Sequence, residues 1–409
     1  MTFMERVVAA LIERRFVHSV IKAIDKAISK IMLQLFYMTT PVCDNRIIFL
    51  TFRGEYDCNA KWIVEELAKR DVPYELYWAI NRKKILDTIE LPEGVIPVVK
   101  GRYNFYKALA SAKIIVDNGI TTVHHNYTKK RKQILIETWH GSLGIKKFSP
   151  DANKDKLWVK KAFKEARMTS YLISNSTFED DVYRDSYWPK TPIWRMGHAR
   201  NDILVEGNTE RVQAYRENIF HTYNLEPDTK ICLYAPTFRD DGDMRPYKID
   251  YDELAEALER RFGGKWVIMT RFHFRMRKLT EKMRLADHVI NVSDYPDIME
   301  LLTCVDVGIT DYSSWICDYL LTKRPGFLFA TDMDEYQLED RSFFYPLTDL
   351  PYPLAVDNVQ LIDNILNFDD TGFEEKCQAF LDDKGCMDDG HAAERIADAI
   401  EALMKGQKV

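Results

Sequence analysis

The stretch RIIFLTFRGEYDCNAKWIVEELAKRDVPYELYWAI, residues 46–80, decides the fold of this chain. Its first seven residues form the short apolar run that is typical of a buried strand. Residues 59–70 then repeat apolar side chains at helical spacing, and residues 74–80 return to a strand pattern. Strand, helix and strand in this order predict a parallel sheet with a crossover helix.

The same alternation continues in two series. The first adds the strands KIIVDN (113–118), QILIETW (133–139) and SYLISNS (170–176). A polar helical stretch, residues 201–229, interrupts the pattern and is the expected hinge. The second series consists of KICLYAPTFRDD (230–241), KWVIMTRFH (265–273), HVINVSD (288–294), VDVGITD (305–311) and RPGFLFA (324–330). We therefore predict an α/β fold with two Rossmann-like domains that face a cleft.

The expected domain boundaries follow from these series. Residues 1–40 form an N-terminal helical segment, residues 41–205 the first Rossmann-like domain and residues 206–388 the second. Residues 389–409 form a C-terminal helix that ends the chain.

The N-terminal segment has the pattern of a basic amphipathic helix. Six Lys or Arg residues and three Asp or Glu residues lie between its apolar positions, which predicts a helix in the interface of an anionic membrane. The alternative is a helix that packs on its own domain or in a homo-oligomer. No uncharged apolar stretch is long enough to cross a bilayer. The apolar positions are Met4, Val8, Leu11, Val20, Ile24, Ile28, Ile31 and Leu35.

The composition of the 409 residues limits the function classes. A formal net charge of -6 argues against a dedicated nucleic-acid binder. The seven cysteines form no CxxC pair, so neither a zinc knuckle nor a disulfide framework is expected. P-loop, dinucleotide-binding, kinase and α/β-hydrolase signatures are missing. Two D-x-D pairs, at 241–243 and 332–334, could hold a divalent ion, but such pairs arise easily in acidic loops and we predict no metal site.

Polar residues stand at the ends of five expected strands, where open α/β sheets bind ligands. In ITDYSS (309–314), Ser313 and Ser314 open a helix whose amides favour an anion such as phosphate. The alternative is that Asp311 or Ser313 only caps that helix. The other four segments are TWHGS (138–142), GHARND (197–202), APTFRD (235–240) and RFHF (271–274).

These segments contain side chains that could donate hydrogen bonds to a phosphate, and one candidate base. Arginine offers a two-pronged donor to phosphate, although a structural salt bridge or turn is the alternative in each case. His140 can take a proton from a hydroxyl near pH 7, and Gly141 and Ser142 after it favour a cleft over a core position. The donor candidates are Thr237 and Arg239, Arg271 and His273, and Arg200, Asn201 and Asp202.

Taken in order, these motifs make the chain resemble the CDP-glycerol glycerophosphotransferase family, whose members prime and polymerise wall teichoic acid and similar phosphate-linked capsular polymers. The resemblance runs from about Arg46 to Tyr352. It rests on FLTFRGEYDCNAKWIVEEL, AKIIVDN, ETWHGSLGIKK, GHARNDIL, YAPTFRD and GITDYSSWICDYLLTKRPGFLFATDMDEY.

The resemblance implies a GT-B-like fold with an acceptor-side first domain and a CDP-alditol-binding second domain. It implies transfer of an alditol phosphate from CDP-glycerol or a related CDP-alditol to a lipid-linked glycan acceptor, with release of CMP. No cofactor beyond this donor is implied. The resemblance also implies peripheral attachment to the cytoplasmic face of the bacterial cell membrane.

The resemblance carries over to individual positions. His140 matches the catalytic histidine of the family and His273 matches its second functional histidine. The positions that match the lining of the CDP-alditol site are Thr237, Arg239, Thr310, Asp311, Ser313 and Ser314.

The chain departs from the family pattern at three places. It has WHGSLGIKK where the family usually has WHGTPLK, GHARND in place of GYPRND, and Phe274 in place of a proline. The first departure lies beside the proposed active site, where we expect acceptor or alditol preference to be set.

These assignments give one mechanism and leave two rivals. His140 would remove the proton of the acceptor hydroxyl during in-line attack on the phosphorus that bears the alditol. Arg239, His273 and the helix start at Ser313 and Ser314 would stabilise the departing phosphate. One rival is a GT-B glycosyltransferase that uses a nucleotide sugar. The other is a non-catalytic membrane-bound scaffold in envelope assembly.

Overall fold

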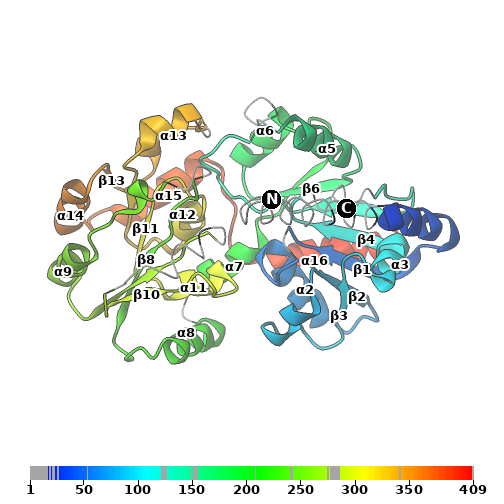
Figure 1. Ribbon diagram of the computed structural model, residues 1–409, viewed down its shortest axis with the longest axis horizontal. Coiled ribbons are helices and arrows are strands. Elements are labelled where there is room, and N and C mark those ends of the chain that lie inside the picture. The colour runs from blue at the N-terminus through cyan, green and yellow to red at the C-terminus, as the bar shows by residue number, and fades with distance from the viewer. Residues whose placement is uncertain are drawn as a thin grey trace, which may run out of the picture.

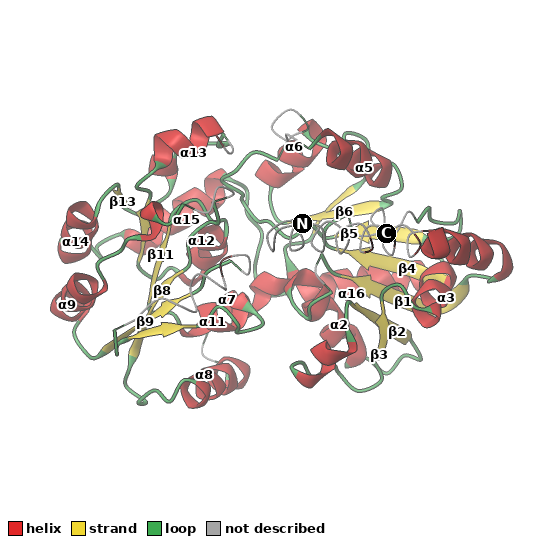
Figure 2. Cartoon of the chain, in the orientation of Figure 1, coloured by secondary structure: helices red, strands yellow, loops and turns green. Residues whose placement is uncertain are grey.

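The computed structural model describes residues 17, 20, 24, 27–52, 54–120, 127–148, 150, 155–207, 209–239, 243–273, 276, 286–339 and 342–407. In this part of the chain two lobes lie side by side, each built on one sheet with helices on both faces (Figure 1, Figure 2). Every strand pair in both sheets is parallel. The predicted α/β fold with two Rossmann-like sheets is confirmed.

The N-terminal lobe has a seven-stranded sheet that is covered on both faces. Ile47 and Phe49 of its first strand pack in one cluster with the helix that follows, while Ile48 and Leu50 pack in the cluster on the other face. This alternation explains why the strand is a continuous apolar run. The strand order is β3 (Ile96–Val99), β2 (Glu75–Ile80), β1 (Cys43–Leu50), β4 (Ala112–Asp117), β5 (Ile134–Glu137), β6 (Tyr171–Ser174) and β7 (Ile193–Arg195).

The C-terminal lobe has a six-stranded sheet with the same kind of order. In both sheets the strand order reverses beside the first strand, between β1 and β4 and between β8 and β11. The C-terminal order is β10 (Val289–Asn291), β9 (Trp266–Thr270), β8 (Lys230–Tyr234), β11 (Val307–Thr310), β12 (Gly326–Phe329) and β13 (Leu354–Ala355).

Helices cover the sheets and connect the lobes. The chain crosses to the C-terminal lobe through α7 and α8, within the predicted hinge, and α16 returns to pack on α2 of the N-terminal lobe (Figure 1). The helices are α2 (Cys58–Ala68), α3 (Tyr103–Ser111), α5 (Lys156–Ala166), α6 (Thr177–Asp185), α7 (Asp202–Val205), α8 (Glu210–Thr222), α9 (Tyr251–Phe262), α11 (Ile298–Cys304), α12 (Trp315–Tyr319), α13 (Met333–Glu339), α14 (Asn358–Leu366), α15 (Phe373–Asp383) and α16 (Ala392–Met404).

Buried ion pairs join the two lobes. Lys61 of α2 lies 2.9 Å from Asp297 at the start of α11, and both side chains are at most 5% exposed. Arg200, just before α7, lies 3.1 Å from Asp318 of α12, and these two side chains are also almost fully buried. Desolvated charges need their partners, so these pairs specify how the lobes meet.

A helix precedes the first sheet and leaves an apolar stripe exposed. Residues 27–39 are helical, and so are the described residues 17, 20 and 24. Leu33 and Phe36 are buried against the N-terminal lobe. The predicted apolar positions Val20, Ile24, Ile28, Ile31 and Leu35 are exposed instead, whereas Met4, Val8 and Leu11 lie outside the described residues. Among the described residues, no helix combines the length and apolarity that a membrane-spanning helix needs.

Candidate active site

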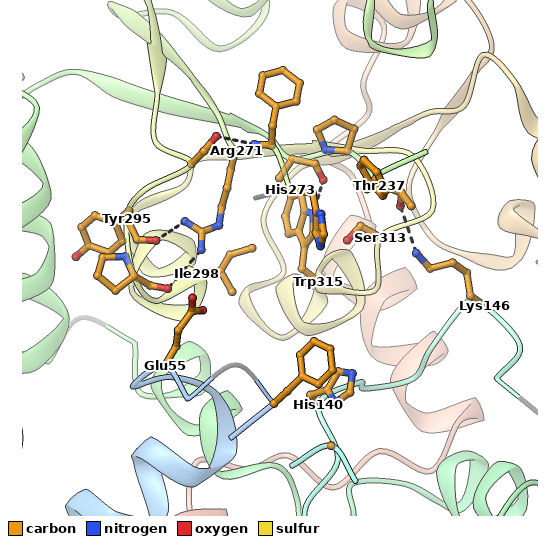
Figure 3. Close-up of a pocket in the computed structure, with 18 of the residues that line it drawn as sticks. Glu55, His140, Lys146, Thr237, Arg271, His273, Tyr295, Ile298, Ser313 and Trp315 are labelled. Atoms are coloured by element: carbon orange, nitrogen blue, oxygen red, sulfur yellow. Dashed lines mark hydrogen bonds between the residues drawn. The ribbon is translucent and has the colours of Figure 1, made fainter. Parts of the chain in front are cut away.

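A cleft of about 1190 Å³ lies between the lobes, and residues that follow the strands of both sheets line it. It is found where the strand order reverses in each sheet, which is where open α/β sheets bind ligands. Figure 3 shows His140 on one side and Thr237, His273, Ser313 and Trp315 on the other. The predicted site residues that line the cleft are His140, Thr237, Arg271, His273 and Ser313.

His140 has the geometry of a base. Its Nδ1 lies 2.6 Å from the carbonyl oxygen of Asn118. A carbonyl only accepts, so Nδ1 carries the proton and Nε2 keeps the lone pair that can take one. The ring is held between Phe52 and Trp139, with ring centroids 5.7 and 4.5 Å away. The side chain is nevertheless exposed to the cleft, so this is no core histidine.

Thr237 faces His140 from the loop after β8. Its N–H donates to Asp311 Oδ1 at 2.8 Å, which ties this loop to the one after β11. Its hydroxyl accepts a hydrogen bond from Lys146 Nζ at 3.4 Å (Figure 3). Lys146 belongs to the loop that follows His140, so this contact joins the two lobes across the cleft and brings a positive charge to the C-terminal wall.

Arg239, Asp311 and Thr310 are not among the residues that line the cleft. The Arg239 guanidinium pairs with Asp311 at 2.8 Å and with Asp332 at 2.6 Å, and its side chain is 5% exposed. The Thr310 hydroxyl donates to the Ala235 carbonyl at 2.8 Å. These contacts hold the loops of the C-terminal wall, and direct contact of these residues with a donor stays a prediction.

His273 and Arg271 follow β9 on the same wall. The imidazole of His273 is exposed and stacks on Phe238, with ring centroids 5.1 Å apart. The Arg271 guanidinium donates to the backbone carbonyls of Val292 and Tyr295 at 3.2 and 2.5 Å. Burial lowers the pKa of Arg271 because desolvation disfavours the charged form. A half-buried guanidinium held by neutral carbonyls adds positive potential to this wall and favours an anionic ligand.

The segment Arg200, Asn201 and Asp202 lies at the interlobe crossing and outside the cleft lining. Arg200 is engaged with Asp318, as described above. Asn201 donates to the Asp388 carboxylate at 2.8 Å. The Asp202 carboxylate accepts the first two N–H groups of α16 at 2.9 and 2.7 Å. These contacts hold α12 and α16 in place. This structural role explains why the segment is polar.

Gly141, Ser142 and Ser314 also lie outside the cleft lining. Ser142 is buried, and its hydroxyl accepts from Asn175 Nδ2 at 2.8 Å. Ser314 precedes α12, a helix of five residues, and makes no capping hydrogen bond through its side chain. Of the predicted helix start, Ser313 is therefore the residue that reaches the cleft.

Several residues that line the cleft were missed by the sequence prediction. Phe52 follows the first strand and Lys146 follows the His140 turn, both within the quoted motifs. These positions were the sequence signal that could have identified them as site residues. Trp158 and Tyr336 come from α5 and α13, where helical spacing does not tell which side chain faces a cleft. Glu55 and Trp315 were also missed.

One carboxylate group among the described residues has the spacing of metal ligands. Oxygens of Asp117, Glu137 and Glu165 lie within 4.8 Å of one another, and all three residues are buried. Burial and the two neighbouring carboxylates raise the pKa of Glu137. A raised pKa favours the neutral form of the Glu137 carboxyl, which lowers the negative charge that a cation would meet at this group. In the D-x-D pair at 332–334, Asp332 already pairs with Arg239, while Asp241 and Phe274 lie outside the described residues.

Comparison with known sequences identifies the family. The profile of the CDP-Glycerol:Poly(glycerophosphate) glycerophosphotransferase family matches residues 31–402. The chain belongs to this family. The expected resemblance is confirmed.

Two curated relatives show how much of such proteins this chain covers. It is 31% identical over 379 residues to the teichoic acid poly(glycerol phosphate) polymerase of Staphylococcus epidermidis, an alignment that covers 88% of this chain and 51% of the polymerase. It is 29% identical over 372 residues to the teichoic acid glycerol-phosphate transferase of Staphylococcus aureus, which covers 87% of this chain and 92% of the transferase. The chain thus spans about half the length of this polymerase and of the teichoic acid poly(glycerol phosphate) polymerase of Bacillus subtilis.

A solved structure agrees with the fold. A histidine variant of the wall teichoic acid polymerase TagF, soaked with CDPG, aligns with a TM-score of 0.80 and 28% identity over 99% of each chain. The likeness confirms the GT-B-like arrangement of two Rossmann-like lobes.

Proposed function

We propose that this chain transfers an alditol phosphate from a CDP-alditol to a hydroxyl of a lipid-linked acceptor or a growing teichoic acid-like polymer, and releases CMP. Glycerol phosphate is the expected group and ribitol phosphate the alternative. The observation that carries this proposal is the His140 imidazole, held by Asn118 so that Nε2 can accept a proton, opposite a wall of cations and hydroxyls. Family membership supports the same reaction class.

In this mechanism the acceptor hydroxyl attacks the phosphorus that bears the alditol. The new bond joins the acceptor oxygen to that phosphorus, and the bond to the CMP oxygen breaks. His140 Nε2 takes the hydroxyl proton, and the stack with Phe52 and Trp139 keeps the ring oriented for this transfer.

The C-terminal wall would hold the diphosphate and stabilise the charge that gathers on the departing CMP. Arg271 and His273 supply positive or hydrogen-bonding groups, and Thr237 and Ser313 supply hydroxyls. Lys146 adds a cation from the other lobe. Donors that are fixed in place before the reaction stabilise the transition state at little reorganisation cost.

A donor panel tests the proposal. The enzyme is incubated with membrane acceptor and CDP-glycerol, CDP-ribitol or UDP-sugars, and released CMP and UDP are measured. We expect CMP from a CDP-alditol, and a loss of about 10²–10⁴-fold in kcat for His140→Ala. His391→Ala is the matched control, because His391 is an exposed histidine before α16 and should keep normal turnover.

Three outcomes would contradict the proposal. Release of UDP would indicate a glycosyltransferase. No turnover of any donor by the folded wild-type protein would favour a non-catalytic scaffold. Near-normal turnover by His140→Ala would remove His140 as the base.

The same function would act at the cytoplasmic face of the cell membrane through peripheral attachment. Ile28, Ile31 and Leu35 are 52%, 66% and 46% exposed on the N-terminal helix, so the described part of the chain leaves an apolar stripe uncovered on this face. Lys130 donates to the Phe36 and Thr40 carbonyls at the end of this helix and belongs to the basic run KKRK, 129–132. An apolar stripe beside basic residues favours an anionic lipid surface.

Vesicle co-sedimentation tests the attachment. Ile31→Asp should weaken binding to vesicles that contain anionic lipid. Val359→Asp is the control, because Val359 is 77% exposed on α14 of the other lobe. Equal binding by the two variants would refute this surface.

A further inference from the structure

A buried carboxylate lies directly under the His140 turn. Glu137 is the last residue of β5 and pairs in register with Asp117, the last residue of β4. Its side chain is fully buried, although glutamate is a residue type that is rarely found in the interior of a protein. The backbone chains that continue from these two strand ends, residues 118–120 and 138–140, build one side of the cleft.

Glu137 accepts hydrogen bonds from both of these loops. Its Oε1 accepts from the N–H of Trp139 at 2.8 Å, and its Oε2 accepts from the N–H of Ile120 at 3.3 Å. Trp139 and Ile120 have φ values of 53° and 60°, in the left-handed region that non-glycine residues rarely adopt. Bulky residues keep such a conformation only where the surroundings fix it. The carboxylate therefore fixes two strained turns at once.

These two turns hold the parts that orient His140. The loop after β5 carries the imidazole, and the loop after β4 carries the Asn118 carbonyl that accepts from Nδ1 at 2.6 Å. The loops lie so close that a Cβ at Gly119 would be 3.2 Å from the Phe52 Cβ and 3.6 Å from His140 Nδ1. A shift of either loop would change the distance between the imidazole and its carbonyl partner.

We propose that Glu137 is a positioning residue for His140, acting by tying the two loops together. The inference rests on the proposed function because it takes His140 as the base. Glu137 does not touch the substrate in this scheme. It keeps the Nδ1–H tautomer bonded to Asn118 and keeps Nε2 directed at the acceptor hydroxyl, and a misplacement of about 1 Å at such a group can cost on the order of 10²-fold in rate.

Glu137→Gln is the main variant, because it preserves size while its amide nitrogen cannot accept a hydrogen bond. One loop N–H then loses its acceptor. Glu137→Asp is the second variant, since it keeps the carboxyl group but shortens its reach to the two loops. Glu165→Gln is the matched control: Glu165 belongs to the same buried carboxylate group, but lies on α5 rather than beside the turn.

The experiment measures kcat and KM with CDP-glycerol, the pH profile of kcat, and the ¹⁵N spectrum of labelled histidine side chains, with His140→Ala used to assign the His140 signals. We expect both Glu137 variants to lose about 10–100-fold in kcat. Their KM should change by less than about threefold, because the C-terminal wall that is proposed to hold the donor belongs to the other lobe. The Nδ1–H signal of His140 should weaken or disappear, and the pH profile should shift. Glu165→Gln should keep the kcat, the pH profile and the His140 signal.

The outcomes separate this inference from the proposed function. If His140→Ala is inactive but both Glu137 variants keep wild-type kcat and the Nδ1–H signal, the positioning role is refuted while the base remains. If Glu137→Asp behaves like wild type, the reach of the carboxyl group to the two loops does not matter and the inference also fails. If His140→Ala turns over normally, the proposed function fails, and the ¹⁵N spectra still decide whether Glu137 orients the imidazole.

Discussion

The substitution Arg239→Met tests whether this residue supports the C-terminal wall of the cleft or binds the donor itself. Its guanidinium pairs with Asp311 at 2.8 Å and Asp332 at 2.6 Å and donates to the Thr237 carbonyl at 2.7 Å. Removal of one partner from a buried ion pair leaves an uncompensated charge and costs about 3–5 kcal/mol. For a domain of this size, each kcal/mol lowers the melting temperature by about 2–4 °C, so Arg239→Met should lower it by about 6–20 °C.

The assay is thermal unfolding of the wild type, of Arg239→Met and of the triple variant Arg239→Met/Asp311→Asn/Asp332→Asn. In the triple variant the amide oxygens can still accept from Thr237 N and Tyr312 Oη, both 2.8 Å away in the wild type. With all three charges gone, most of the lost stability should return. Arg184→Met, at an exposed pair with Asp181, should melt like the wild type. If Arg239→Met melted within about 2 °C of the wild type while its KM for CDP-glycerol rose tenfold, Arg239 would be a donor ligand and the reasoning would be wrong.

Three further predictions concern single residues. Lys146→Ala should raise the KM for CDP-glycerol about tenfold or more, because it removes a charge-assisted contact with the diphosphate. A KM equal to that of the exposed control Lys160→Ala would contradict this. Arg271→Met should also raise the KM for CDP-glycerol, because the wall loses a half-buried cation, and steady-state kinetics on the folded variant would show it. The pKa of His198 is raised above 6.5 because Glu179, 2.8 Å away, outweighs burial. The contribution of protonated His198 to the free energy of unfolding is present below pH 6.5 and is lost as pH rises through the higher pKa of the folded state. Denaturant midpoints should therefore fall as pH rises from 6.5 through that pKa, and His198→Gln should abolish this fall.

Much of the fold could be predicted because the strands of a parallel sheet covered on both faces are apolar runs. Ile47 to Leu50 are fully buried, and the sequence shows them as an uninterrupted run between polar segments. The edge strands β3 and β13 were not predicted. β3 has four residues and contains Pro97, and β13 has two residues. An edge strand can be short and can include proline because one side has no partner, so the local pattern that marks a strand is weakest there.

The site was harder to predict because a strand end fixes where a residue lies but not where its side chain points. Ser313 lines the cleft and Ser314 does not, and both lie between β11 and α12, where no regular strand pattern fixes the direction of a side chain.

The same argument applies to His140, whose ring direction depends on the Asn118 carbonyl in the loop after a different strand, β4. That contact exists because Asp117 and Glu137 are in register at the ends of β4 and β5. The residue type at 140 therefore suggests a base, but the register between two strands decides which ring nitrogen can act as one.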